Sequence, residues 1–202
     1  MYVKVCGLTT VDAARVAVAA GADAIGVVMN RTSPRAVDAD LARSIIAAVG
    51  DDADTVLVVN DKTADEAARL AVDLGADVLQ LHGAYSPDDF ATALRHLPRV
   101  WRATSLAEHP DLTVGACGEE ALLLDAARPG SGRRWDTGSL ASTPAGRWIL
   151  AGGLAPDNVA AAITAAHPWG VDVSSGVESA PGVKDHDAIR AFVGAARSVR
   201  AS

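Results

Sequence analysis

The sequence predicts an α/β protein, a trimmed (β/α)8 TIM barrel of eight parallel strands with a weak or missing helix after strand five. Short β-branched runs alternate with longer, alanine-rich amphipathic segments along 202 residues. Strands that alternate with helices pair in parallel, because each helix returns the chain to the same edge. Eight such units match a closed barrel, although roughly 250 residues is usual for one. An open, doubly wound sheet of eight strands is the structural alternative.

The expected strands are short apolar runs, typical of strands that are buried on both faces. The run Ala24-Ile-Gly-Val-Val28 is a clear example. The eight expected strands are residues 3–6, 24–28, 55–59, 78–81, 99–102, 121–124, 148–151 and 170–173.

The expected helices carry one apolar stripe each. In the second, apolar residues recur at i, i+4, i+5 and i+8 from Leu41 to Val49. Between strands five and six, Pro110, Gly115 and Gly118 interrupt any helical pattern, which makes this unit the weakest. The expected helices are residues 11–20, 38–49, 62–74, 87–97, 156–166 and 186–196.

Two near-repeats, at residues 19–25 and 73–79, fall at matching joints between a helix and the next strand. They predict one turn used twice, with glycine closing the helix. For the first helix we expect Thr9 or Thr10 as the N-cap and Gly21 as the C-cap.

Composition limits the class of protein. With 50% hydrophobic and 21% charged residues the chain is globular rather than disordered, and we expect a single domain over residues 1–202. A net charge of −7 disfavours nucleic-acid binding, and no apolar run approaches the roughly 18 residues of a membrane span. Two cysteines and a start that reads directly into a strand indicate a cytoplasmic protein, expected to be a monomer or homodimer.

In a barrel of this kind the reacting groups lie at the carboxyl ends of the strands and in the loops that follow them. This rule selects a small set of residues from the chain. They are Cys6 and Gly7, the loop 30–35, Asn60, His82 and Gly83, Arg102, Asp125, Gly152 to Leu154, and Ser174 to Gly176.

The loops after strands seven and eight favour a phosphate site. Glycine lets the main chain approach phosphate oxygens, and serine adds a hydroxyl donor. Two ordinary glycine turns are the alternative. The expected phosphate-binding residues are Gly152, Gly153, Ser174, Ser175 and Gly176.

Three side chains at strand ends have both a structural and a chemical interpretation. Cys6 is a small buried hydrophobe or a reactive group. Asp125 ends an apolar strand, where a carboxylate is costly unless it serves the site or caps a loop N–H. His82 is a structural group or a ligand. The five histidines lack metal-site spacing, so we expect no metal, and the basic loop 129–134 is a lid, an anion contact or a surface loop.

In chain order, these segments resemble the phosphoribosylanthranilate isomerase family of tryptophan biosynthesis over nearly the full length. An opening Lys4-Val-Cys-Gly7 combined with a late Asp172-Val-Ser-Ser-Gly-Val-Glu178 is highly specific. The other matching segments are Gly21-Ala-Asp-Ala-Ile-Gly26, Ser33-Pro-Arg35, Leu79-Gln-Leu-His-Gly83, Leu123-Leu-Asp125, Ala151-Gly-Gly-Leu154, Asp157-Asn158 and Pro181-Gly-Val-Lys-Asp185.

The resemblance implies an Amadori rearrangement of a small phosphosugar, N-(5-phosphoribosyl)anthranilate, without a cofactor. By residue-to-residue match, Cys6 is implied as the general base and Asp125 as the general acid. We further expect Arg35 to hold the anthranilate carboxylate, because a guanidinium meets a carboxylate with two parallel hydrogen bonds. Pairing of Arg35 with Asp38 or Asp40 is the alternative. His82 and Asp172 complete the expected substrate-binding set.

The chain also departs from its relatives. It has Val27-Val-Met29 where they commonly carry an aromatic, and Arg102 where they often carry lysine. It has Pro129-Gly-Ser-Gly132 and Trp135-Asp136-Thr137 in place of a Gly-Gly-Thr-Gly loop that leads to Phe-Asp-Trp. These changes affect the aromatic end of the expected site more than its phosphate end.

Two other functions stay open at this point. Another phosphosugar barrel is one: an epimerase would normally want metal-ligating His and Asp, and the indole-forming synthase of the same pathway would need lysine and glutamate. A non-catalytic phosphate-binding barrel is the other, and the presence of both Cys6 and Asp125 argues against it.

Overall fold

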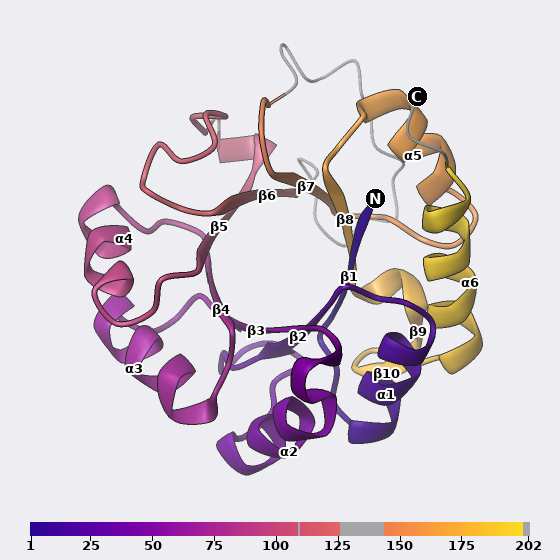
Figure 1. The fold of residues 1–202 in the computed structure, drawn as a ribbon, viewed down its shortest axis with the longest axis horizontal. Helices are drawn as coiled ribbons and strands as arrows, with labels where there is room; N and C mark the ends of the chain where they lie inside the picture. The colour runs from indigo at the N-terminus through magenta and orange to yellow at the C-terminus, as the bar shows by residue number, and fades with distance from the viewer. Residues whose placement is uncertain (109, 126–143, 200–202) are drawn as a thin grey trace.

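The computed structural model describes residues 1–108, 110–125 and 144–199, and its central feature is a closed ring of eight parallel strands (Figure 1). Each strand pairs with the next, and β8 pairs with β1 through Tyr2 opposite Gly170 and Lys4 opposite Asp172. This closure confirms the barrel and excludes the open sheet, which would leave two unpaired edges. The strands are β1 Tyr2–Cys6, β2 Ala24–Val28, β3 Asp54–Val59, β4 Val78–His82, β5 Val100–Ser105, β6 Ala121–Asp125, β7 Trp148–Ala151 and β8 Gly170–Val173.

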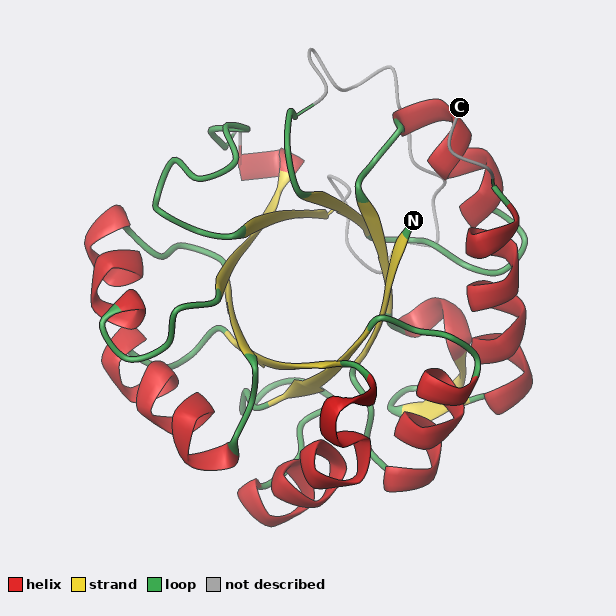
Figure 2. Cartoon of the chain, viewed as in Figure 1, coloured by secondary structure: helices red, strands yellow, loops and turns green. Residues whose placement is uncertain are grey.

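The helices cover the outside of the ring, so the buried strands have a partner on both faces (Figure 2). In the described residues between β5 and β6, a 3₁₀ turn at Leu106–Glu108 and a loop take the place of a helix, which confirms the weak unit. The expected loop 129–134 and residues 135–137 lie outside the described residues. The helices are α1 Val11–Ala19, α2 Ala39–Val49, α3 Ala64–Leu74, α4 Pro87–Leu94, α5 Val159–Ala166 and α6 His186–Ser198.

The repeated turn joins α1 to β2 and α3 to β4. Gly21 and Gly75 have φ angles of 96° and 73°, which side chains other than glycine rarely adopt. The N-cap of α1 is Thr10, whose side chain accepts a hydrogen bond from the Ala13 N–H. The expectation that Gly21 is the C-cap was wrong by one residue, because Ala20 holds that position and Gly21 follows it.

Strand alternation separates two apolar layers. One face of each strand packs against the helices, and the other fills the barrel with side chains such as Val56, Val58, Trp101 and Leu123. A fully buried lysine, Lys4, also lies inside the barrel. Because burying an unpaired charge is costly, a lysine in this position requires a partner that compensates its charge.

One element was not expected from the sequence. After β8, a 3₁₀ turn at Ser175–Val177 leads into a small antiparallel hairpin, β9 Glu178–Ala180 and β10 Val183–Lys184. The Thr9 hydroxyl donates to the Gly182 carbonyl in its turn at 2.7 Å. The hairpin therefore connects the β8 loop to the segment after β1.

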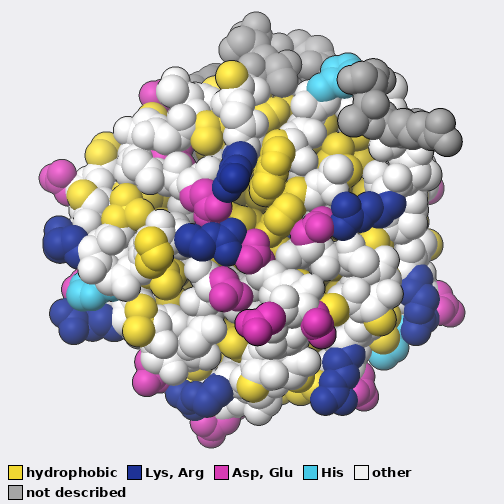
Figure 3. Space-filling view, in the orientation of Figure 1, with side chains coloured by type: hydrophobic (Ala, Val, Ile, Leu, Met, Phe, Trp, Pro, Cys, Tyr) yellow, Lys and Arg dark blue, Asp and Glu magenta, His cyan; other side chains and the backbone are white. Residues whose placement is uncertain are grey.

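The surface is mixed in character. Figure 3 shows charged side chains of both signs interspersed over the face in view. Among the described residues, the large hydrophobic side chains that are exposed are Val72 and Val183. None of the described helices combines the length and the apolar character that crossing a membrane requires.

Candidate active site

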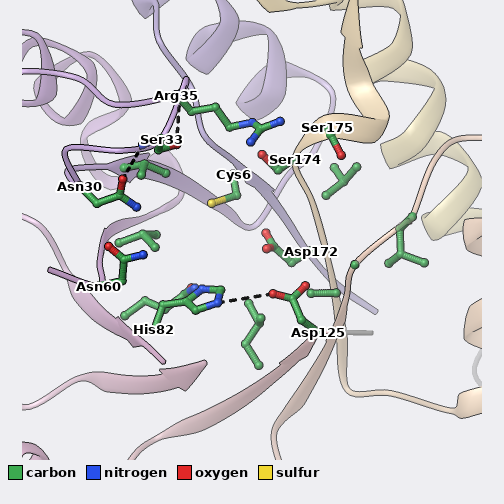
Figure 4. A pocket seen from close by; sticks show the side chains of 18 of the residues that line it. Cys6, Asn30, Ser33, Arg35, Asn60, His82, Asp125, Asp172, Ser174 and Ser175 are labelled. Carbon is green, nitrogen blue, oxygen red and sulfur yellow. Dashed lines mark hydrogen bonds and ion pairs between the residues drawn. The ribbon is translucent and has the colours of Figure 1, made fainter. Parts of the chain in front are cut away.

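A pocket of about 360 Å³ lies at the carboxyl ends of the strands and draws residues from β1, β2, β3, β4, β6, β7 and β8 and from loops after them (Figure 4). Most of the strand-end residues selected from the sequence meet here. Those that line it are Cys6, Asn30, Ser33, Arg35, Asn60, His82, Asp125, Gly152, Gly153, Leu154, Ser174 and Ser175, together with Asp172.

Cys6 ends β1 with its thiol inside the barrel. Gly26 on the neighbouring strand makes room for it, since a Cβ there would lie 2.8 Å from the sulfur. Burial raises the pKa of the Cys6 thiol, and the nearby ammonium of Lys4 opposes that shift. The thiol is therefore protonated at neutral pH.

Lys4 lies two residues earlier on the same face, and its Nζ is 3.0 Å from Oδ1 of Asp172 on β8. Burial disfavours the ammonium, but the charge of Asp172 and interactions with Asp172 and Cys6 outweigh it, and the pKa of Lys4 is raised. A positive charge is thus fixed beneath the pocket, next to the thiol.

Asp125 ends β6, and its side chain is only 14% exposed. Burial, with a smaller contribution from the charge of Asp172, raises the pKa of Asp125 from 3.8 to about 7. Nε2 of His82 lies 3.7 Å from Oδ2 of Asp125, too far for a hydrogen bond. Burial lowers the pKa of His82, so that the imidazole is neutral at pH 7. The neighbouring imidazole therefore does not hold Asp125 ionised.

The loop after β7 turns sharply into the pocket through two glycines. Gly152 and Gly153 have φ angles of 84° and 68°. The Asn158 amide fixes the loop, because its Nδ2 donates to the Gly153 carbonyl at 2.9 Å and its Oδ1 accepts from the Ala155 N–H at 2.9 Å. Gly176 is not among the pocket-lining residues; a Cβ on it would overlap the Leu154 carbonyl, so it brings the two loops into contact.

Arg35 lines the pocket, and its carboxylate partner is Glu178 rather than Asp38 or Asp40. Its Nε and Nη2 donate to the two oxygens of Glu178, at 2.7 and 2.8 Å. Glu178 also accepts a hydrogen bond from Lys184 at 2.8 Å. An arginine with one edge held in this way still has its other N–H groups for a ligand.

The expectation that Arg102 ends strand five at the site was wrong. Strand β5 continues to Ser105, and Arg102 faces outward because its neighbours Trp101 and Ala103 face the barrel interior. Its guanidinium donates to Glu119 at 2.8 Å and to two carbonyls of the loop that replaces the missing helix. Arg102 therefore supports this loop.

The sequence of the chain matches one family of known proteins over nearly its full length. The sequence model described as N-(5'phosphoribosyl)anthranilate (PRA) isomerase matches residues 3–195. The chain belongs to this family. Proteins named N-(5'-phosphoribosyl)anthranilate isomerase from Acidithiobacillus ferrooxidans and Haloferax volcanii are 45% and 42% identical to it, over 96% and 98% of this chain and 97% and 94% of theirs. It is accordingly an isomerase.

Solved structures of the family share the barrel. The structure of TrpF from Jonesia denitrificans is 59% identical with a TM-score of 0.93, covering 98% of both chains. Phosphoribosyl anthranilate isomerase from Thermus thermophilus is 36% identical with a TM-score of 0.87, covering 99% of this chain and 100% of that one. A phosphoribosyl anthranilate isomerase in complex with reduced 1-(o-carboxyphenylamino)-1-deoxyribulose 5-phosphate is 27% identical with a TM-score of 0.79, covering 98% of each chain.

Three residues of the isomerase site were not expected from the sequence. Gln80 lines the pocket from inside β4, and its Oε1 has no hydrogen-bond partner among the described residues. The inward alternation of β4 was the signal that could have found it. Glu178 and Lys184 lie within matching segments of the resemblance, but their role depends on the unexpected hairpin.

Proposed function

We propose that the chain converts N-(5-phosphoribosyl)anthranilate into 1-(o-carboxyphenylamino)-1-deoxyribulose 5-phosphate in this pocket, with Cys6 as the general base and Asp125 as the general acid. The observation that carries the proposal is Asp125, a buried carboxyl that holds its proton up to about pH 7. It faces the same pocket as the Cys6 thiol, with Asp172 between them in Figure 4.

The chemistry needs one proton donor and one proton acceptor. Asp125 gives its proton to the ribose ring oxygen, the C1′–O bond breaks, and the ring opens to a protonated Schiff base. The Cys6 thiolate then takes the proton from C2′, and the electron pair moves to form the enolamine. Tautomerisation of the enolamine gives the ketose. The fixed charge of Lys4 favours the thiolate form when the base is needed.

The phosphate is assigned to the loops after β7 and β8. Gly152 and Gly153 supply backbone N–H groups, and Ser174 and Ser175 add N–H and hydroxyl donors at the same edge of the pocket. Loops at these two positions commonly hold phosphate in barrels of this type.

Replacing Gly153 with valine is expected to weaken phosphate binding, because the side chain occupies the anion's place and is strained at a φ of 68°. We expect the inhibition constant of inorganic phosphate to rise roughly tenfold, for a loss of about 1.4 kcal/mol. Gly83→Val is the matched control, since Gly83 also has positive φ but open space around it and no place in the pocket lining. Equal losses in both variants would contradict the assignment.

Replacing Arg35 with methionine is expected to raise KM by roughly 10–100-fold, as for loss of a hydrogen bond to a charged group. The alkyl part of the side chain is kept, so the loss reports the guanidinium. An aniline analogue of the substrate without the carboxylate should be nearly insensitive to the change. If both substrates lose equally, Arg35 stabilises its loop rather than binding the carboxylate.

Complementation of a tryptophan auxotroph that lacks this isomerase tests the function directly. The purified protein should then accelerate the fluorescence decay of phosphoribosylanthranilate. If the folded protein fails both assays, the chain is instead a non-catalytic phosphate-binding barrel. The epimerase alternative has no specific support, because the described residues hold no group of three or more His, Cys, Asp or Glu suited to a metal ion.

The assembly and location are part of the same proposal. We expect a monomer or a homodimer, since the related isomerase from Thermotoga maritima is dimeric and has also been crystallised as monomers. We also expect the protein to work in the cytoplasm, because its two cysteines, Cys6 and Cys117, are both free thiols.

A further inference from the structure

The β9–β10 hairpin lies against both loops that we assign to the substrate's two anionic groups. Its turn contacts the loop after β2, because a Cβ on Gly182 would meet the carbonyl of Pro34, the residue before Arg35. Its two ends carry Glu178 and Lys184, which are ion-paired at 2.8 Å. Lys184 is almost fully enclosed, with its side chain 1% exposed. Burying an ion pair has a desolvation cost, so stability alone is a weak reason for the Glu178–Lys184 pair to lie here.

Glu178 orients Arg35. Its carboxylate takes the Nε and Nη2 edge of the guanidinium in a bidentate pair, which directs the Nη1 side away from the carboxylate. Burial raises the pKa of Glu178, but hydrogen bonds from Arg35 and Lys184 outweigh it and the pKa is lowered. The glutamate is therefore ionised and faces two basic side chains, Arg35 and Lys184. Burial lowers the pKa of Lys184, and the adjacent Glu178 carboxylate opposes that shift.

Lys184 orients the β8 loop. Its Nζ donates to the Ser174 carbonyl at 2.8 Å and lies 3.4 Å from the Ser174 hydroxyl. The carbonyl and the N–H of one peptide unit point in opposite directions. With the Ser174 carbonyl held by Lys184, the Ser175 N–H points away from the lysine, and Ser175 lines the pocket.

Gly7 brings the two anion-binding groups close together. A Cβ on this residue would lie 2.6 Å from Cδ of Arg35 and 2.9 Å from Oγ of Ser174. The side chains of Arg35 and Ser174 therefore both pack against Gly7, which lies between β1 and α1. Figure 4 shows the Arg35 guanidinium above Ser174.

We propose that Glu178 and Lys184 are positioning residues that hold the Arg35 guanidinium and the Ser174–Ser175 backbone in fixed orientations beside each other, so that both present N–H donors to the anionic groups of the ligand. This inference rests on the proposed function. Neither residue takes part in proton transfer; each acts through the group that it orients.

The experiment measures equilibrium binding of two separate probes, inorganic phosphate and anthranilate, to variants of the full chain. Lys184→Met is expected to weaken phosphate binding roughly tenfold and to change anthranilate binding less than twofold. Glu178→Gln is expected to weaken both, because the carboxylate holds Arg35 directly and Lys184 as well. A tenfold change in Kd corresponds to about 1.4 kcal/mol.

Glu119→Gln is the matched control. Glu119 is also a buried glutamate in a pair with a buried cation, Arg102, and it lies away from the pocket. The Glu119→Gln variant should lower the melting temperature as Glu178→Gln does, without changing the Kd of phosphate or anthranilate. The double variant Glu178→Gln with Lys184→Gln removes both charges of the buried pair and leaves only Arg35, whose side chain is 24% exposed, without its carboxylate partner. It therefore tests binding if a single variant fails to fold.

The outcomes separate the inference from the proposed function. If the wild-type protein binds both probes and converts substrate, but the variants bind them with unchanged affinity or lose both probes in proportion to their melting temperature, the positioning role is wrong. If the wild-type protein neither binds the probes nor converts substrate, the proposed function itself is wrong.

Discussion

Replacing Cys6 with alanine is expected to lower kcat by roughly 10²–10⁴-fold, the usual cost of losing a positioned acid or base. No other thiol among the described residues lines the pocket, so nothing replaces the base. The barrel should remain folded, because the change removes one buried sulfur atom beside Gly26 and leaves only a small cavity. Turnover of phosphoribosylanthranilate under saturating substrate is the measurement.

Cys117→Ala provides the control for this variant. Cys117 is partly buried in the loop between β5 and β6, outside the pocket. Its replacement should leave turnover unchanged. Near-normal turnover in Cys6→Ala would assign Cys6 to the packing of the barrel alone.

Replacing Asp125 with asparagine is expected to reduce kcat by a similar factor, roughly 10²–10⁴-fold, with little change in KM. Asparagine keeps the shape of the side chain but cannot donate a carboxyl proton to the ring oxygen. The pH profile distinguishes this role from a structural one. If the variant unfolds while the folded fraction keeps its activity, Asp125 is structural.

The pH dependence follows from the order of the two pKa values. The productive form has Asp125 protonated and Cys6 ionised, yet the pKa of Asp125 is about 7 and burial raises that of Cys6. Below pH 7 the product of the two fractions grows with pH, as the thiolate does. Between the two pKa values the gain in thiolate and the loss of protonated Asp125 cancel. We therefore expect kcat/KM to rise up to about pH 7 and then level off, with the break at pH 7 absent in Asp125→Asn.

The same pKa shift links Asp125 to stability. The folded-state value of about 7 lies above the ordinary 3.8, so the folded protein binds this proton more tightly than the unfolded chain. Its stabilising effect is complete below about pH 4 and is lost as pH rises through 7, at about 1.4 kcal/mol per pKa unit. Asp125→Asn should therefore raise the melting temperature relative to wild type more at pH 8 than at pH 4. If the difference in melting temperature between Asp125→Asn and wild type does not change with pH, burial does not raise the pKa of Asp125.

The elements that the sequence predicted well are those with strong local signals. Strand β2 matches its expected bounds because five consecutive buried residues and a glycine turn define it. The end of β5 was placed too early, because the polar Arg102 resembles a loop residue although it faces an ion-pair partner outside the barrel. The β9–β10 hairpin was missed because its strands are three and two residues long and their pairing depends on neighbouring loops.

Local properties of the chain, its hydrophobic periodicity and its helix-ending glycines, were enough to predict the eight strands, the helices that follow most of them, and the end of the barrel at which chemistry can occur. Resemblance of its motifs indicated the family. The charge state of the site, in contrast, depends on the folded arrangement. The protonation of Asp125 requires burial by β6 and its neighbours, and the pairing of Arg35 with Glu178 joins residues 143 positions apart. Desolvation and long-range ion pairing arise only when distant segments meet, so no local pattern in the sequence encodes them.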